Sequence, residues 1–282
     1  MSPREGIVRR CPLRRAGLTL VELLLAVSIM SIMAGMLGAL AMAVQTSFEC
    51  SQGNGDAVQH ARVNLDRISR LIAEATATAE YPGVVVAYED YGAWRFPDTL
   101  VIWHPTGDPA NAAGPPLISE LIIICPDPAN PNRLIEATLP TDNRPVPASY
   151  AQDPASWYPI LRALVGTSAA RKTVLTNLMR ASSATAVPGP ATSATRLRGA
   201  VRFERELRPS AADWTRFTQG TLAWNNLAWP QGIYGTQTGL RQVWVRTELQ
   251  LMPGEHVLAA DTQGQQAIPF LGSGTLHYEL KK

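Results

Sequence analysis

The chain has 282 residues, a formal net charge of +2 at pH 7, 46% hydrophobic residues and 17% charged residues. This composition is typical of a folded protein and excludes a disordered one. Three cysteines are too few for a disulfide-built scaffold. The first 17 residues hold five arginines against one glutamate, so the rest of the chain is slightly acidic. Because a basic excess is absent beyond residue 17, we do not expect nucleic acid as a partner.

An apolar segment follows the arginines. Residues 23–44 contain no charged side chain, and as a helix they would span about 33 Å, enough for a bilayer core of about 30 Å. Because the arginines flank only the N-terminal side, the positive-inside rule predicts a cytoplasmic N-terminus. The residues after Val44 are then translocated, which makes the chain a single-pass inner-membrane protein with a periplasmic C-terminal part and the lipid bilayer as a partner.

Three interpretations of this segment compete. A plain membrane anchor is the first. A secretory signal is the second, since Ala41-Met42-Ala43 has the small-x-small form of a cleavage site and would release a secreted enzyme that starts at Gln45. The third explains Glu22, a carboxylate inside an apolar helix that costs on the order of 2.5–3.5 kcal/mol at the bilayer centre and less near its edge. An anchor or a signal has no use for this residue.

The segment 14–24, RRAGLTLVELL, closely resembles the processing and methylation site of type IV prepilins and type II secretion pseudopilins. The resemblance implies cleavage after Gly17 by a prepilin peptidase and N-methylation of the new N-terminus at Leu18 by the same peptidase/N-methyltransferase. It also implies that Glu22 serves in filament assembly, with other pilins or pseudopilins and an inner-membrane assembly platform as partners. In a water-free filament core, the positive N-terminus of a neighbouring subunit could neutralise the carboxylate.

The resemblance and the sequence pattern together predict an α+β, pilin-like fold. We expect a cleaved basic leader at 1–17, a transmembrane helix at 18–47, its amphipathic continuation at 48–81 and a periplasmic β-rich globular domain at 82–282. We expect Gly53-Asn54-Gly55 to weaken or kink the helix and Pro82-Gly83 to end it. An apolar stripe at spacings of three and four marks its buried face. The stripe consists of Val58, Ala61, Leu65, Ile68, Ile72, Ala75 and Ala79.

The sequence of the domain itself predicts short strands separated by loops. A helical insertion is predicted at 157–181, broken near Gly166. Alternation along 243–251 predicts a strand with one solvated face. The predicted strands are 84–88, 99–103, 120–125, 133–137, 199–206, 242–251 and 275–280.

No pattern in this domain indicates an enzyme, a metal site or a cofactor. The four histidines lack the spacing of metal ligands, and we interpret 127–132 as a solvated turn and 272–274 as a turn between strands. Cys50 and Cys125 are expected to lie too far apart to pair. The tryptophans, all downstream of the long helix, are interpreted mainly as core residues.

These observations predict a structural and assembly protein, a minor pilin or pseudopilin. Residues 63–72 resemble the corresponding helix of J-type minor pseudopilins and W-type minor pilins. The alternative is a membrane-anchored periplasmic binding module without a filament role, which would use the tryptophan-rich region 224–229.

Overall fold

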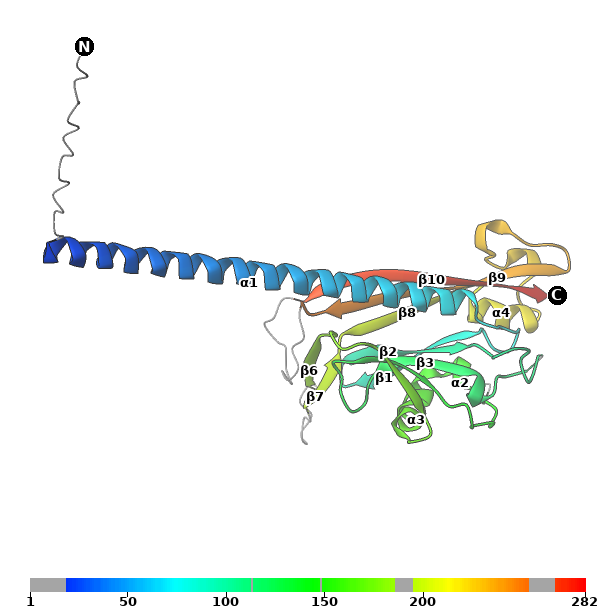
Figure 1. Ribbon diagram of the computed structural model, residues 1–282. Helices are drawn as coiled ribbons and strands as arrows, with labels where there is room; N and C mark the ends of the chain where they lie inside the picture. The colour runs from blue at the N-terminus through cyan, green and yellow to red at the C-terminus, as the bar shows by residue number, and fades with distance from the viewer. Residues whose placement is uncertain (1–18, 113, 148, 186–194, 254–266) are drawn as a thin grey trace, which may run out of the picture. The chain divides into compact units, whose positions relative to one another are not determined.

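The computed structural model describes residues 19–112, 114–147, 149–185, 195–253 and 267–282 (Figure 1). They belong to two compact units, Met1–Glu49 and Cys50–Lys282. The predicted α+β class is confirmed: a long N-terminal apolar helix is followed by a domain of antiparallel sheets. Helices are α1 Leu20–Ala73, α2 Ser149–Gln152, α3 Pro154–Gly166 and α4 Ala211–Thr218. Strands are β1 Val84–Tyr91, β2 Trp94–Trp103, β3 Leu121–Pro126, β4 Leu134–Thr138, β5 Arg171–Thr176, β6 Ala181–Thr185, β7 Thr195–Gly199, β8 Val201–Arg208, β9 Thr238–Leu251 and β10 Ile268–Lys281.

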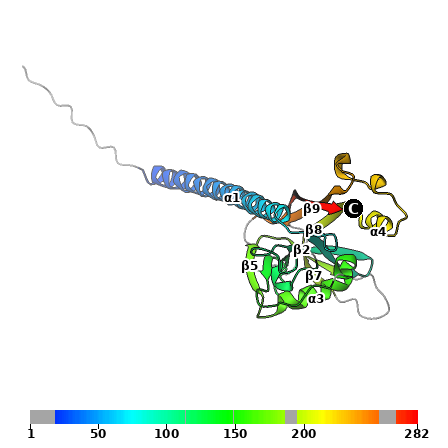
Figure 2. The same cartoon turned by 90° about the vertical axis from the view of Figure 1, so that its right-hand side faces the viewer.

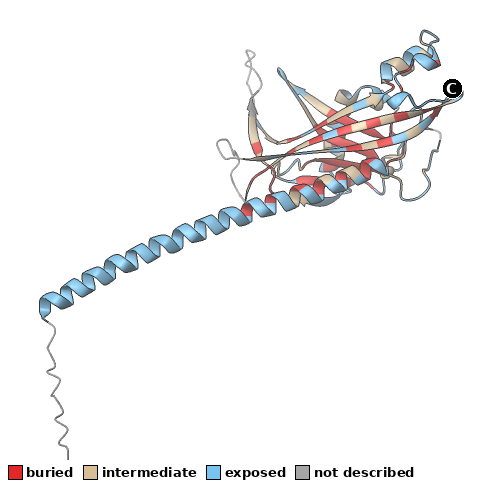
Figure 3. Ribbon diagram, turned by 90° about the horizontal axis from the view of Figure 1, so that it is seen from above, coloured by how far each residue is buried: buried red, intermediate tan, exposed pale blue. Residues whose placement is uncertain are grey.

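Helix α1 is continuous through Gly53-Asn54-Gly55, so the predicted kink is wrong. Two glycines lower helix propensity by about 1 kcal/mol each, but a helix propagates once nucleated, and Gly53 is already the first buried residue of α1. Figure 3 shows α1 as one uninterrupted helix, exposed over its N-terminal part and with buried residues toward its C-terminal end. The helix ends at Ala73 instead of near residue 81. The Thr76 N–H donates to the Trp103 carbonyl at 2.9 Å, so the backbone turns to meet the end of β2.

The buried face of α1 follows the predicted spacing of three and four but is rotated from the predicted stripe. Ile68 and Ile72 are buried as predicted, whereas Val58 is 51% exposed. Small residues occupy the start of the buried face, where a larger side chain would hold the sheets away from the helix. The buried residues are Gly53, Ala57, Ala61, Asn64, Ile68, Leu71 and Ile72.

The five-stranded sheet has the order β1-β2-β3-β4-β5, and every neighbouring pair is antiparallel. One face of β1–β3 shares a core with α1 and with β8 and β9, and the other face packs on α3 (Figure 2). Because both faces are covered, these strands are runs of apolar residues such as Leu121–Pro126.

All seven predicted strands are present, with shifted ends. The predicted helical insertion is correct only to Gly166, since β5 and β6 occupy most of 171–185. Strand β5 contains β-branched residues and pairs with β4 from Leu134 to Thr138. Tertiary pairing therefore decides the structure of a segment whose local pattern favoured helix.

The three-stranded sheet has the order β10-β9-β8. Val243, Val245, Thr247, Leu249 and Leu251 are all buried, and the positions between them are not, so the predicted alternation of β9 is confirmed. Residues 272–274 lie inside β10, and their interpretation as a turn is wrong.

Two of these residues allow α1 to approach the sheet closely. A Cβ atom at Gly272 would lie 2.9 Å from Leu65 Cδ2. One at Gly274 would lie 2.9 Å from Ile72 Cδ1 and 3.1 Å from Ser69 Cα. The glycines therefore set the distance between helix and strand, a role that strand propensity alone does not show.

We expect Gly274→Ala to lower the free energy of unfolding by about 1–3 kcal/mol, because the added methyl group would crowd the Ile72 side chain and the Ser69 Cα of the helix. Gly55→Ala is the matched control. Gly55 is exposed on α1 with nothing within 4 Å of its Cβ position, so the same substitution should stabilise by up to about 1 kcal/mol. Urea unfolding of the detergent-solubilised chain, followed by tryptophan fluorescence, measures both. Equal effects of the two substitutions would contradict the packing argument.

The tryptophans divide between core and surface. Trp224 and Trp229 are buried with Leu227 and Leu280 in a small separate core, whereas Trp94 is 57% exposed. The region 224–229 therefore packs inward and does not present its two tryptophans to a ligand. Cys50 is exposed, Cys125 is buried, and both are free thiols.

Candidate functional site

The predicted processing site is at the beginning of α1. Gly17 and Leu18 lie outside the described residues, whereas Thr19 and Glu22 are described. One carboxylate oxygen of Glu22 accepts the Thr19 N–H at 2.9 Å and the Thr19 hydroxyl at 3.0 Å. In return, the Glu22 N–H donates to the Thr19 Oγ1 at 3.3 Å.

This reciprocal pattern is a capping box, in which an N-terminal Thr and a Glu three residues later satisfy backbone N–H groups that the helix leaves free. The spacing is visible in the sequence as Thr19-x-x-Glu22. The resemblance to prepilins, by contrast, implies only an intermolecular role for Glu22. Glu22 therefore has a local use within its own chain, and any test of its role in assembly has to separate the two.

Residues 20–49 of α1 are exposed throughout. An 18-residue window of this helix has a mean hydropathy of 2.3 and no buried residue. By length and composition, the helix could cross a membrane. An apolar surface of this extent is unstable in water. A bilayer, or the apolar helices of other subunits, would cover it.

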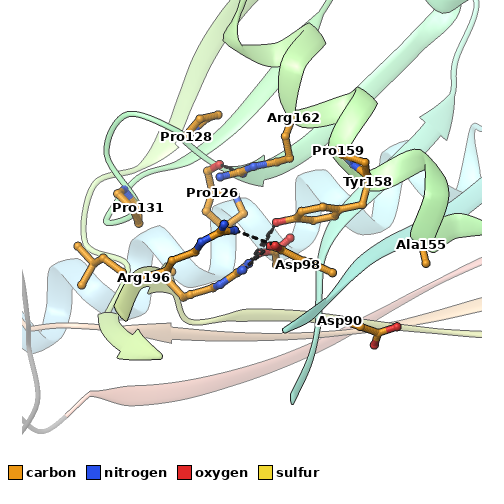
Figure 4. Close-up of a pocket in the computed structure, with 14 residues that line it drawn as sticks. Asp90, Asp98, Pro126, Pro128, Pro131, Ala155, Tyr158, Pro159, Arg162 and Arg196 are labelled. Atoms are coloured by element: carbon orange, nitrogen blue, oxygen red, sulfur yellow. Dashed lines mark hydrogen bonds and ion pairs between the residues drawn. The ribbon is translucent and has the colours of Figure 1, made fainter. Parts of the chain in front are cut away.

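The domain contains a separate cavity of about 820 Å³, lined by residues from α3, from β7 and from the loop after β3 (Figure 4). The buried carboxylate of Asp98, on β2, also lines it. Its Oδ2 accepts the Tyr158 hydroxyl at 3.3 Å and lies 3.6 Å from Arg198 Nη1, and its Oδ1 accepts the Thr99 hydroxyl at 2.9 Å.

The other charges around this cavity are also paired. Glu89 accepts from both Arg196 and Arg198 of β7, and Arg162 Nη1 donates to the Pro126 carbonyl at 2.6 Å. The network ties the β6–β7 hairpin to strands β1 and β2. Because Tyr158, Thr99 and Arg198 already contact both carboxylate oxygens of Asp98, we assign this network a structural role.

Burial raises the pKa of Asp98, and the nearby Arg162 and Arg198 only partly oppose this rise. A raised pKa in the folded state means that folding disfavours the ionised carboxyl, so Asp98 lowers stability as pH rises from about its ordinary value toward its raised value. We therefore expect the stability of the wild type relative to Asp98→Asn to increase as pH falls from 7 toward 4, by at most about 1.4 kcal/mol per pH unit. Urea unfolding at a series of pH values measures this difference. A difference that is constant, or that falls with acidification, would contradict the assignment.

Residues 12–38 match the family model of the prokaryotic N-terminal methylation motif. The chain has a prepilin-type N-terminus. The matched residues include Gly17, Leu18, Thr19 and Glu22 and extend along the exposed apolar part of α1. No curated protein and no solved structure matches the chain.

The other candidates that the structure describes have ordinary structural roles, and His256 lies outside the described residues. His60 Nδ1 lies 3.2 Å from the Thr176 hydroxyl, and His104 Nε2 lies 3.5 Å from Glu74. In the loop 127–132, Asp127 Oδ1 accepts the Ala129 N–H at 3.0 Å, which closes a turn. Among the described residues, no group of three His, Cys, Asp or Glu side chains could hold a metal ion.

Proposed function

We propose that the chain is the precursor of a minor pilin or pseudopilin, assembled into a type IV pilus or a type II secretion pseudopilus. A prepilin peptidase/N-methyltransferase cleaves after Gly17 and methylates the amine of Leu18. The observation that supports this most is the methylation motif at 12–38, which extends into the part of α1, residues 20–49, where every side chain is exposed. A separate β-rich unit of Cys50–Lys282 supports the same proposal, because a subunit of this kind needs a folded domain beyond its apolar helix.

Before assembly, the chain would be held in the inner membrane by the apolar part of α1. The arginines between Arg4 and Arg15 keep the N-terminus in the cytoplasm, and the unit Cys50–Lys282 is periplasmic. Its neighbours are other pilins or pseudopilins and the assembly platform of the inner membrane. The length of the mature chain favours a minor subunit over a small major pilin, and the helix at 63–72 favours the J-type or W-type.

The N-terminus of the mature protein tests this proposal directly. We expect intact-mass and peptide mass spectrometry of the purified membrane protein to find a chain that starts at Leu18 and carries one additional methyl group. A chain that still starts at Met1 would indicate a plain anchor. A chain that starts at Gln45 would indicate a secretory signal.

A further inference from the structure

The inward face of the three-stranded sheet changes character at one end. Phe203 on β8 and Val243 and Val245 on β9 are fully buried in the main core. Side chains two residues apart in a strand point to the same side. Arg205, two residues after Phe203 on β8, and Arg241, two residues before Val243 on β9, therefore lie on this same inward face of the sheet. Arg241 is only 4% exposed and Arg205 is partly exposed. Two positively charged side chains therefore occupy positions where the alternation along β8 and β9 predicts apolar residues.

Neither arginine has a carboxylate within ion-pair distance among the described residues. Arg205 Nη1 donates to the Val84 carbonyl at 2.9 Å, and Arg241 Nε donates to the Pro209 carbonyl at 3.2 Å. Burial and the nearby Arg241 lower the pKa of Arg205. An enclosed pair of like charges is unfavourable unless an anion joins it, and buried Arg198, by contrast, has both Glu89 and Asp98.

Both arginines line a cavity of about 450 Å³, which is within the usual size range of small-molecule sites. Its polar features favour an anion. The first turn of α4 contributes Ala211 and Ala212, and the first N–H groups of a helix have no partner within it.

The rest of the lining restricts the kind of anion. Pro82, Leu207 and Trp214 make apolar walls, and the Trp214 ring centroid lies 5.8 Å from the Arg241 Cζ. The exposed Glu80 also lines the cavity and would repel a dianion more strongly than a monoanion. Guanidinium groups bind planar carboxylates through two parallel hydrogen bonds.

We propose that this cavity binds a single carboxylate attached to an apolar group, held between Arg205 and Arg241. The carboxylate belongs either to a free organic acid or to a glutamate or aspartate side chain of another protein. The inference does not depend on the filament role, because it rests only on residues of the unit Cys50–Lys282.

Calorimetric titration of the full detergent-solubilised chain tests the proposal, with phenylacetate as the probe. We expect phenylacetate to bind, and neutral phenylacetamide and inorganic phosphate to bind much more weakly. Arg205→Gln should weaken phenylacetate binding roughly tenfold or more, because a charged hydrogen bond is lost. Arg208→Gln is the matched control on the same strand, since Arg208 is exposed and already paired with Glu206, and it should bind like the wild type.

A capped peptide, acetyl-Gly-Glu-Phe-amide, distinguishes the two sources of the carboxylate. Binding at least as tight as that of phenylacetate supports an acidic side chain of another protein. Binding of phenylacetate alone supports a free acid.

A second variant keeps the test independent of any folding defect. Ala212→Glu places a carboxylate in the lining, so it should raise the thermal unfolding midpoint and abolish phenylacetate binding, whereas Ala212→Gln should do neither. Phosphate that binds as tightly as phenylacetate would overturn the assignment to a carboxylate. Failure of phenylacetate and the peptide to bind, together with an Ala212→Glu midpoint equal to that of Ala212→Gln, would overturn the site. Correct N-terminal processing of these variants would show that either failure leaves the proposed function untouched.

Discussion

Replacement of Gly17 by leucine is expected to leave nearly all of the protein as uncut precursor. Cleavage after Gly17 requires the peptidase to hold the backbone at the scissile bond, and glycine presents no Cβ there. Immunoblotting and N-terminal mass spectrometry of membrane fractions measure the fraction that still starts at Met1.

Gly35→Leu is the matched control for this substitution. Gly35 lies on the exposed apolar part of α1 with nothing within 4 Å of its Cβ position, so this variant should be processed like the wild type. Normal processing of Gly17→Leu would contradict the assigned cleavage site. Failure of both variants would instead indicate a general insertion defect.

Replacement of Glu22 by leucine is expected to abolish incorporation into a filament while leaving membrane insertion and the folding of the domain intact. Removal of a carboxylate from an apolar segment favours insertion. If Glu22 pairs with the methylated amine of a neighbouring subunit, as the resemblance to prepilins implies, the same removal leaves that amine without its partner in a water-free environment, which is strongly unfavourable. Crosslinking to partner subunits, and secretion or piliation assays, measure the loss, and Glu22→Asp should be intermediate because its side chain is shorter.

The capping box makes a stricter version of this experiment possible. Glu22→Gln keeps an acceptor that can still cap the helix but removes the charge, because glutamine also serves at this position. Thr19→Ala removes the cap, at a cost of about 1 kcal/mol, but keeps the carboxylate. If the charge is what assembly needs, Glu22→Gln should fail and Thr19→Ala should assemble. The reverse result would assign Glu22 to helix capping and overturn its role between subunits.

Sequence reasoning succeeded where the physical cause is local. The apolar segment 23–44 and the alternation along β9 are each produced by residues close together in the chain, whereas the end of α1 at Ala73, before the predicted stop at Pro82-Gly83, is not. The expected strands at 84–88 and 99–103 are continuous apolar runs because both faces of β1 and β2 are covered. Such runs are visible without knowledge of what covers them.

The remaining features depend on partners distant in the chain. Strand β5 forms because β4 offers it an edge, and the glycines of β10 are explained only by α1, about 200 residues earlier in sequence. The same holds for Arg205 and Arg241, since the sequence of neither strand shows which charged groups lie near these side chains in the fold. The Thr19–Glu22 capping box is different, because both of its residues lie within one turn of the chain and its spacing is visible in the sequence.

The cysteines give the processed chain a built-in attachment point for probes. Cys11 precedes the proposed cut after Gly17 and would be removed with the leader. Cys125 is buried, and burial raises the pKa of its thiol to about 12, so it is neither accessible nor ionised near neutral pH. Cys50 alone is exposed, on α1 at the first residue of the second unit. A maleimide dye or spin label would therefore mark one known position of the mature subunit, so that distances between neighbouring subunits could be measured without introducing or removing any residue.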